Sequence, residues 1–168
     1  MSEYNSNFLD QHKEMQIYKL KFLCKLINQK TTLNTNTIAL ENIESWSGKL
    51  IETDSEFAGD AVEFQKNDVL FGKLRPYLAK TYLAESNGEA FGDIYVMRPN
   101  ERITPSFLKY LFLSKELIDL IDSSTYGTKM PRANWDFIGN TFVKVPVISR
   151  QNKITEFLDL KNSEIDQA

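Results

Sequence analysis

The chain has 168 residues, of which 42% are hydrophobic and 12% aromatic, a size and composition typical of one globular domain. Its net charge of −3 and pI of about 5.3 argue, taken for the whole chain, against nucleic acid as a partner. The apolar runs are too short for a membrane span, and the first residues lack the features of a signal peptide. One cysteine and one histidine exclude an internal disulfide framework and argue against a zinc or haem site, so we expect a cytoplasmic protein without a metal site.

The first half of the chain predicts short strands. Residues 1–16 are polar, and we expect a flexible segment there. The mixed pattern of residues 17–27 fits a strand and a short helix equally well. Further strands are expected, between turn formers, at Thr37–Leu40, Ala61–Phe64, Val69–Leu74, Tyr77–Leu83 and Ile94–Met97. Short strands with irregular turns predict a small, twisted, mostly antiparallel sheet.

The second half predicts helices. Thr104-Pro105 is typical of a helix start, with Thr as N-cap and Pro in the first turn. Apolar residues at helical spacing then predict one helix that ends near Ser123. A second, amphipathic helix starts near Ser149 and shows no capping glycine or proline before Ala168, so we expect it to continue beyond this chain. The fold class is thus α/β (α+β), with a domain over residues 17–148 and the C-terminal helix over residues 149–168.

Motifs for catalysis are absent from the sequence. There is no P-loop, no dinucleotide fingerprint, and neither the glycine-rich cofactor loop nor the Asn/Asp-Pro-Pro-aromatic element of an amino-methyltransferase. Asp60, Glu63 and Lys66 come nearest to a nuclease site, but their spacing does not match one. Cys24 lies on an apolar face and is expected in the core. We therefore predict no catalytic residues.

Charge is distributed unevenly along the chain. Residues 69–82 hold three cations and no acid, and residues 123–135 hold two cations and no acid. The rest of the chain carries −8, because the whole carries −3 and these two stretches carry +5. Segregation of this kind produces a local positive surface on an acidic protein.

The first acid-free stretch contains Gly72-Lys-Leu-Arg-Pro-Tyr77. Gly72 permits close backbone approach, and Pro76 restricts the conformation of Arg75. A rigid loop presents its cations well to phosphates or base edges; a hairpin with a merely basic tip fits the pattern equally. The candidate DNA contacts here are Lys73, Arg75, Tyr77 and Lys80.

The second stretch runs from Tyr126 to Trp135 and combines glycine and proline with cations and small polar residues. Such residues contact phosphates and base edges. Trp135 is expected to anchor the loop in the core rather than to stack on a base, and Tyr126 fits either role. The candidate DNA contacts are Tyr126, Gly127, Thr128, Lys129, Arg132 and Asn134.

The C-terminal helix carries an apolar stripe among charged residues. This stripe, made by Ile154, Phe157, Leu158 and Ile165, fits packing on the helix's own domain and packing on a partner helix.

Three segments together resemble the target recognition domains of type I restriction-modification specificity subunits. They are Asn67–Tyr77, Tyr126–Ile138, and the run from Val143 through Asp159 to Ile165-Asp166. The last resembles the family's strand and conserved spacer helix, although Pro146 is its single proline and Arg150-Gln151 stands where Glu-Gln is usual. The resemblance covers residues 17–168.

The resemblance implies a DNA target recognition domain followed by the start of a spacer or dimerisation helix, with no chemistry of its own. Partners would be double-stranded DNA, the methyltransferase (M) subunit and, through the complex, the restriction (R) subunit. S-adenosylmethionine, Mg²⁺ and ATP would bind only to those subunits. Family subunits carry two such domains, so this chain would be a half-subunit or a fragment. A half-subunit could form a homodimer, or pair with a second recognition domain, through its helix and read an interrupted palindrome. The alternative is a protein-interaction module that assembles through this helix without reading DNA.

Overall fold

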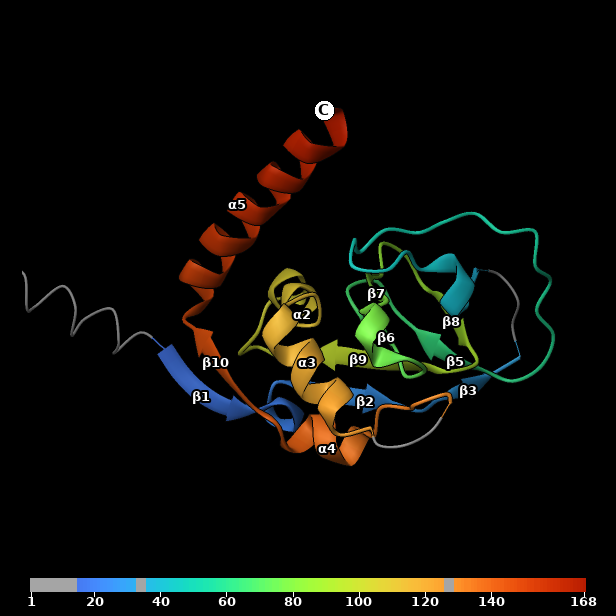
Figure 1. The fold of residues 1–168 in the computed structure, drawn as a ribbon. Coiled ribbons are helices and arrows are strands. Elements are labelled where there is room, and N and C mark those ends of the chain that lie inside the picture. The colour runs from blue at the N-terminus through green and yellow to red at the C-terminus, as the bar shows by residue number, and fades with distance from the viewer. Residues whose placement is uncertain (1–14, 33–35, 126–128) are drawn as a thin grey trace, which may run out of the picture.

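The computed structural model describes residues 15–32, 36–125 and 129–168. A four-stranded sheet lies at its centre, with strand order β2-β9-β6-β7 and antiparallel pairing throughout. The strands span Cys24–Ile27 (β2), Val69–Gly72 (β6), Thr81–Leu83 (β7) and Ile94–Pro99 (β9). This sheet carries the rest of the domain on its two faces (Figure 1).

The two faces of the central sheet fill two separate hydrophobic cores. Alternate residues of β6 point to opposite sides, so Val69 and Phe71 join one core and Leu70 joins the other. Val96 and Met97 of β9 divide in the same way. Because side chains alternate along a strand, a strand buried on both faces is apolar at every position. This explains the unbroken apolar run that the sequence shows in β6.

A second four-stranded sheet, with order β3-β5-β8-β4, covers one face. Its strands are Lys30–Thr31 (β3), Thr37–Ile38 (β4), Ala61–Phe64 (β5) and Gly88–Phe91 (β8), and only the β4–β8 pair is parallel. The sequence did not predict β8, which begins at Gly88. A side chain at Gly88 would stand 2.3 Å from the Asn36 carbonyl oxygen, so this glycine permits the close approach of two backbones.

Helices cover the other face of the central sheet. They are α2 (Pro105–Leu111), α3 (Lys115–Ser123) and α4 (Trp135–Asn140). Thr104 caps α2 as predicted, by accepting a hydrogen bond from the Phe107 N–H at 3.2 Å. The single helix predicted up to Ser123 is two helices, because Ser114 accepts a hydrogen bond from the Leu117 N–H and starts α3. The short helix α4 was not predicted.

The chain returns to its beginning before the last helix. Strand β1 (Met15–Lys19) pairs antiparallel with β10 (Phe142–Pro146), and α5 (Ile148–Gln167) follows. Met15 and Gln16, assigned to the flexible segment by sequence, therefore belong to a strand. Residues 17–27, which fitted strand and helix equally, form the end of β1, a 3₁₀ turn (η1, Leu20–Phe22) and β2.

The mixed, mainly antiparallel α/β architecture with a C-terminal helix confirms the predicted fold class, although the strands divide into three sheets rather than one. Two further 3₁₀ turns, η2 (Leu40–Asn42) and η3 (Pro76–Leu78), lie between strands. The residues expected at Tyr77–Leu83 thus begin as η3 and become β7 only at Thr81. In Figure 1, α5 leaves the domain at the upper left, whereas α4 lies at the bottom.

Candidate nucleic-acid interface

The two acid-free stretches lie side by side in the fold. The Arg75 backbone N–H donates to the Pro131 carbonyl at 2.8 Å, and the Ala133 N–H donates to the Lys73 carbonyl at 2.8 Å. Leu74 and Arg132 face each other between these two bonds as an antiparallel bridge. Segments about sixty residues apart in sequence therefore form one backbone-bonded unit. We call its polar side chains, Lys73, Arg75, Tyr77, Lys129 and Arg132, the basic loop surface.

The first loop bends sharply at Arg75. This residue adopts the left-handed conformation (φ 51°, ψ 62°), which non-glycine residues rarely adopt and which costs about 1–2 kcal/mol. The sequence predicted that Pro76 keeps Arg75 out of the right-handed α region, and the backbone bond to Pro131 shows which alternative is stabilised. Arg75 is exposed, and Tyr77 in η3 is 45% exposed. Both side chains are accessible to a ligand.

Tyr95 of β9 holds the second loop through its hydroxyl group. Its hydroxyl donates to the Ala133 carbonyl at 3.0 Å and accepts from the Trp135 N–H at 3.1 Å. Its ring lies 5.8 Å from the Trp135 ring and 4.8 Å beneath the Lys73 ammonium group, a cation–π geometry. Burial raises the pKa of Tyr95, and the hydrogen bond from Trp135 opposes this shift more weakly. The hydroxyl thus stays protonated as a donor.

Trp135 packs against the hydrophobic core on the helix-covered face of the central sheet, which we call the helix-side core. This confirms its predicted role as an anchor of the loop. Sequence reasoning missed Tyr95, although its place in an apolar strand beside the Gly92-Asp93 turn was a visible signal.

The remaining second-loop candidates divide into three groups. Lys129 is exposed. Asn134 caps α4, because its side-chain oxygen accepts from the Asp136 N–H at 2.7 Å, so its position serves the local fold as well. Tyr126, Gly127 and Thr128 lie outside the described residues and remain predictions.

Arg132 has an acidic neighbour that the sequence did not reveal. Its Nη2 lies 3.0 Å from Oδ2 of Asp93, which belongs to the turn between β8 and β9. The Arg132 side chain is 64% exposed and that of Asp93 is 30% exposed. The basic loop surface, although free of acids in sequence, therefore has the Asp93 carboxylate beside it in space.

Lys80 differs from the other cations. Its ammonium group donates to the Leu40 carbonyl at 2.7 Å, and its Cβ would lie 3.3 Å from a side chain placed at Gly72. The close approach that Gly72 permits is thus between β6, Lys80 and Leu40, not toward a ligand. Because its charge is used within the domain, we leave Lys80 out of the proposed interface.

A second kind of surface occurs at the C-terminal helix. Gln151 on its first turn is fully buried: its Oε1 accepts from the Thr104 N–H at 2.8 Å, and its Nε2 donates to the carbonyls of Arg102 and Pro146 at 2.9 Å each. One side chain therefore joins the α2 entry, the end of β10 and α5. This is the residue that matches the second position of the family's Glu-Gln pair.

The apolar stripe predicted on this helix is divided. Ile154 packs against the helix-side core, and Leu158 is half-buried. Phe157 is 57% exposed and Ile165 is 70% exposed. Leu160, which lies outside the predicted stripe, is 57% exposed. The first turns of α5 therefore dock on the domain, whereas its later apolar side chains face solvent.

Polar contacts hold the middle of α5 to α2. Asp159 accepts a hydrogen bond from Tyr110 and lies 3.7 Å from the Lys109 ammonium group. Burial and then the neighbouring Asp159 carboxylate raise the pKa of Tyr110 to about 12. Tyr110 thus remains a neutral donor to Asp159 at neutral pH, which fixes the direction of the helix.

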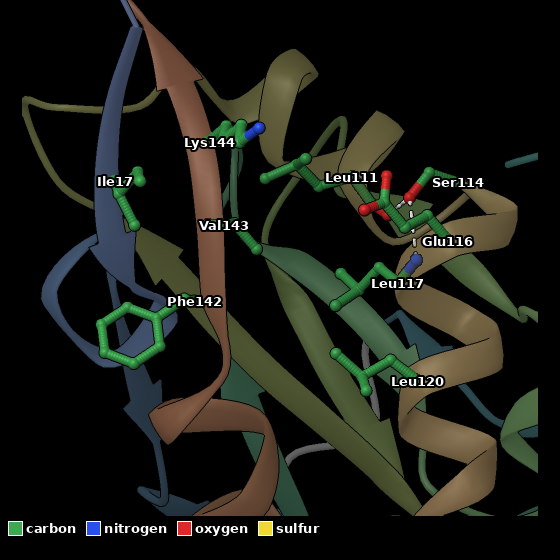
Figure 2. A pocket seen from close by; sticks show the side chains of 9 residues that line it. All are labelled: Ile17, Leu111, Ser114, Glu116, Leu117, Leu120, Phe142, Val143 and Lys144. Carbon is green, nitrogen blue, oxygen red and sulfur yellow. Dashed lines mark hydrogen bonds between the residues drawn. The ribbon is translucent and has the colours of Figure 1, made fainter.

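An apolar groove of about 270 Å³ opens between β1, β10 and the α2–α3 pair (Figure 2). Ile17 and Phe142, both more than 60% exposed, lie on one side of it, and Leu117 and Leu120 lie on the other. An apolar lining of this kind suits protein rather than phosphate. The groove is therefore a second candidate for a protein contact.

Candidate metal ligands and the cysteine were considered in the part of the chain that the structure describes. No group of three His, Cys, Asp or Glu there could hold a metal ion. Cys24 is buried in the core as predicted, and burial raises its pKa to about 12, so the thiol is unreactive at neutral pH. Within the same residues, no helix has the length and apolar character needed to cross a membrane.

Comparison with known proteins confirms the resemblance seen in the motifs. No family model matches the chain. The chain is 28% identical over 127 residues to the type I restriction enzyme EcoDI specificity subunit of Escherichia coli. This match covers 72% of the chain and 28% of that protein, so the chain spans well under half of the relative's length.

Solved structures confirm the fold. The HsdS subunit from Thermoanaerobacter tengcongensis superimposes with a TM-score of 0.76 at 19% identity, covering 92% of this chain and 43% of that one. The S subunit of a type I system from M. genitalium gives 0.62 at 12% identity, covering 91% and 40%. A chain from a structure concerned with complex assembly and conformational transition of the type I restriction-modification system gives 0.65 at 14% identity, covering 92% and 40%.

Proposed function

We propose that this chain is a sequence-reading DNA recognition module of a type I restriction-modification specificity subunit, which directs methyltransferase and restriction subunits to a target site. The observation that carries the proposal is the joining of the two basic stretches into one backbone-bonded surface. The similarity of the fold and sequence to specificity subunits supports it.

The geometry of the basic loop surface suits duplex DNA. Phosphate contacts supply most of the affinity of DNA-binding proteins, and base-edge contacts supply the specificity. Arg75 and Lys129 are exposed cations on neighbouring loops, and backbone hydrogen bonds hold those loops in one register. A preorganised surface loses little conformational entropy on binding, so its cations and aromatic groups contact DNA at low cost.

The proposed module has no chemistry of its own. S-adenosylmethionine would bind to the methyltransferase subunit, and Mg²⁺ with ATP would serve the restriction subunit. We assign the assembly contacts to α5, where Phe157, Leu160 and Ile165 are exposed, and to the apolar groove beside β1 and β10. A homodimer, or a second recognition domain, would meet α5 there, and the complex would act on chromosomal DNA in the cytoplasm.

Duplex binding measured by fluorescence anisotropy tests the proposal. We expect the 168-residue chain to bind a duplex at about 50 mM salt, with a log–log salt slope near −0.9 per phosphate contact. The double variant Arg75→Ala/Lys129→Ala should flatten this slope by about 2 if each residue contacts one phosphate. Its unfolding midpoint should stay unchanged, because both side chains are exposed.

Lys115→Ala/Lys153→Ala provides the matched control, since it removes two exposed cations from α3 and α5. An equal loss of affinity in both double variants would show a general charge effect and contradict the assignment of the surface. The alternative function, a protein-interaction module, predicts that the chain binds no duplex while Phe157→Ser/Ile165→Ser abolishes its associations. Point substitutions are preferable to removal of residues 149–168, because removal would also delete the buried Gln151.

A further inference from the structure

Asp93 places a carboxylate where a DNA-binding surface should avoid one. Its Oδ2 lies 3.0 Å from Nη2 of Arg132, and its backbone carbonyl accepts from the Lys73 N–H at 2.8 Å. Both basic loops are thus attached to one residue of the β8–β9 turn. An acid that faces a polyanion weakens binding to every sequence alike. The Asp93 carboxylate therefore does not raise the affinity for DNA, and a role in discrimination between DNA sequences fits its position.

Arg132 is restrained at both ends of its side chain. Its Cα lies between Pro131 and Ala133, whose backbone groups are bonded to Arg75 and Lys73, and its guanidinium group is held through Nη2 by Asp93. The side chain is nevertheless 64% exposed, so donors not directed at Asp93 remain accessible. A guanidinium group carries five N–H donors in a fixed fork, and one carboxylate contact leaves a pair of them for a second planar acceptor.

That arrangement matches a base edge better than a phosphate. Guanine presents O6 and N7 as two acceptors in the major groove, and a bidentate arginine is the commonest contact to them. A phosphate accepts a cation from many directions and requires no such restraint. The nearby Asp93 carboxylate also repels phosphates from Arg132. Among the described residues of the basic loop surface, the other full charges are Lys73, over the Tyr95 ring, and the exposed Arg75 and Lys129.

Resting on the proposed function, we propose that Arg132 reads a guanine in the target sequence, that Asp93 is its positioning residue, and that Arg75 and Lys129 bind phosphates. An exposed ion pair biases the orientation of a side chain by no more than about fivefold. Asp93 therefore increases the preference for guanine by no more than about fivefold, whereas Arg132 itself supplies most of that preference.

Selection from a randomised duplex library, followed by affinity measurements on single-base variants of the selected site, tests this inference. We expect the wild-type chain to select a sequence with at least one fixed guanine. Arg132→Lys should lose the preference for that guanine by about tenfold or more, yet keep its affinity for random duplex because the charge remains. Asp93→Asn should bind random duplex more tightly and lose up to about fivefold of the same preference.

Lys153→Arg is the control, because Lys153 is an exposed cation of α5 outside the basic loop surface and the selected sequence should not change. An unaltered guanine preference in Arg132→Lys would overturn the inference while leaving the proposed function intact. An unaltered preference in Asp93→Asn would overturn the positioning role of Asp93 alone. If the wild-type chain selects no sequence and binds no duplex, the proposed function itself fails. Thermal unfolding of each variant separates these outcomes from misfolding, which would lower affinity for all sequences equally.

Discussion

The basic loop surface and the α5 end of the molecule differ in how they are held and in what they leave exposed. Backbone hydrogen bonds and the Tyr95 hydroxyl fix the loops, and cations remain exposed on them. A buried glutamine, a half-buried isoleucine and the contacts of Asp159 with Tyr110 and Lys109 fix α5, and apolar side chains remain exposed on it. Exposed charge on a rigid backbone suits a polyanion, whereas exposed apolar groups on a helix suit another protein. The proposed partner of the basic loop surface is therefore DNA, and the proposed partner of α5 is another protein.

The anchor of α5 gives the largest expected effect. Gln151→Leu keeps a similar volume but leaves the Thr104 N–H and two carbonyls without their partner. Each buried unsatisfied group costs about 1–3 kcal/mol, so we expect a loss of roughly 3 kcal/mol in the free energy of unfolding after partial rehydration. Urea unfolding followed by circular dichroism measures it. Asn152→Leu, at an exposed neighbour, should change stability by less than about 0.5 kcal/mol; equal losses in both variants would refute the anchor role.

The exposed stripe of α5 gives the next effect, which concerns association rather than stability. Phe157→Ser/Ile165→Ser should weaken association at least about tenfold, or about 1.4 kcal/mol, because two apolar side chains lose their burial. Light scattering over a range of protein concentrations measures the molecular mass of the purified chain, and hence its self-association. Ile154→Ser should instead destabilise the domain, because Ile154 packs on its core. A wild-type chain that remains monomeric at every concentration would contradict self-association through α5.

Tyr95→Phe should destabilise the second loop of the basic loop surface. The substitution removes the hydroxyl that bonds the Ala133 carbonyl and the Trp135 N–H, at a cost of about 1–2 kcal/mol in the free energy of unfolding. Because these bonds fix the second loop, duplex affinity should also fall by a few fold, while association through α5 should not change. Tyr77→Phe, on an exposed ring, is the control for stability. A loss of stability with full DNA affinity would show that the loop does not depend on Tyr95 for binding.

The smallest expected effect is at Arg75, where one substitution should change duplex affinity without lowering stability. Arg75→Gly relieves the left-handed strain at φ 51°, but glycine raises the entropy of the unfolded chain, so we expect stability to stay equal or rise by up to about 1 kcal/mol. Duplex affinity should fall by about threefold to tenfold, as one phosphate contact is lost. Asn67→Gly, at φ 74° in another turn, should leave DNA affinity unchanged. A marked loss of stability in Arg75→Gly would show that the Arg75 side chain stabilises the fold, and would contradict a role in DNA binding alone.

Local signals in the sequence were sufficient where the physics is local. Ala61–Phe64 was predicted with the bounds that β5 has, and the Thr104 cap and Pro105 located the start of α2. The break at Ser114 and the strand at Gly88 were missed, because a capping hydrogen bond and a close contact with Asn36 decide them. Neither leaves a periodic pattern in the sequence.

The sequence by itself determined the composition of the site: two acid-free stretches rich in cations, an anchoring Trp135, and a helix with an apolar stripe. Only the tertiary structure decided that the stretches pair through Lys73, Arg75, Pro131 and Ala133, that Asp93 joins Arg132, and that Lys80 turns away to Leu40. The physical reason is that charge and periodicity are properties of a segment, whereas hydrogen-bond partners and exposure depend on which distant segments the folded sheets bring together.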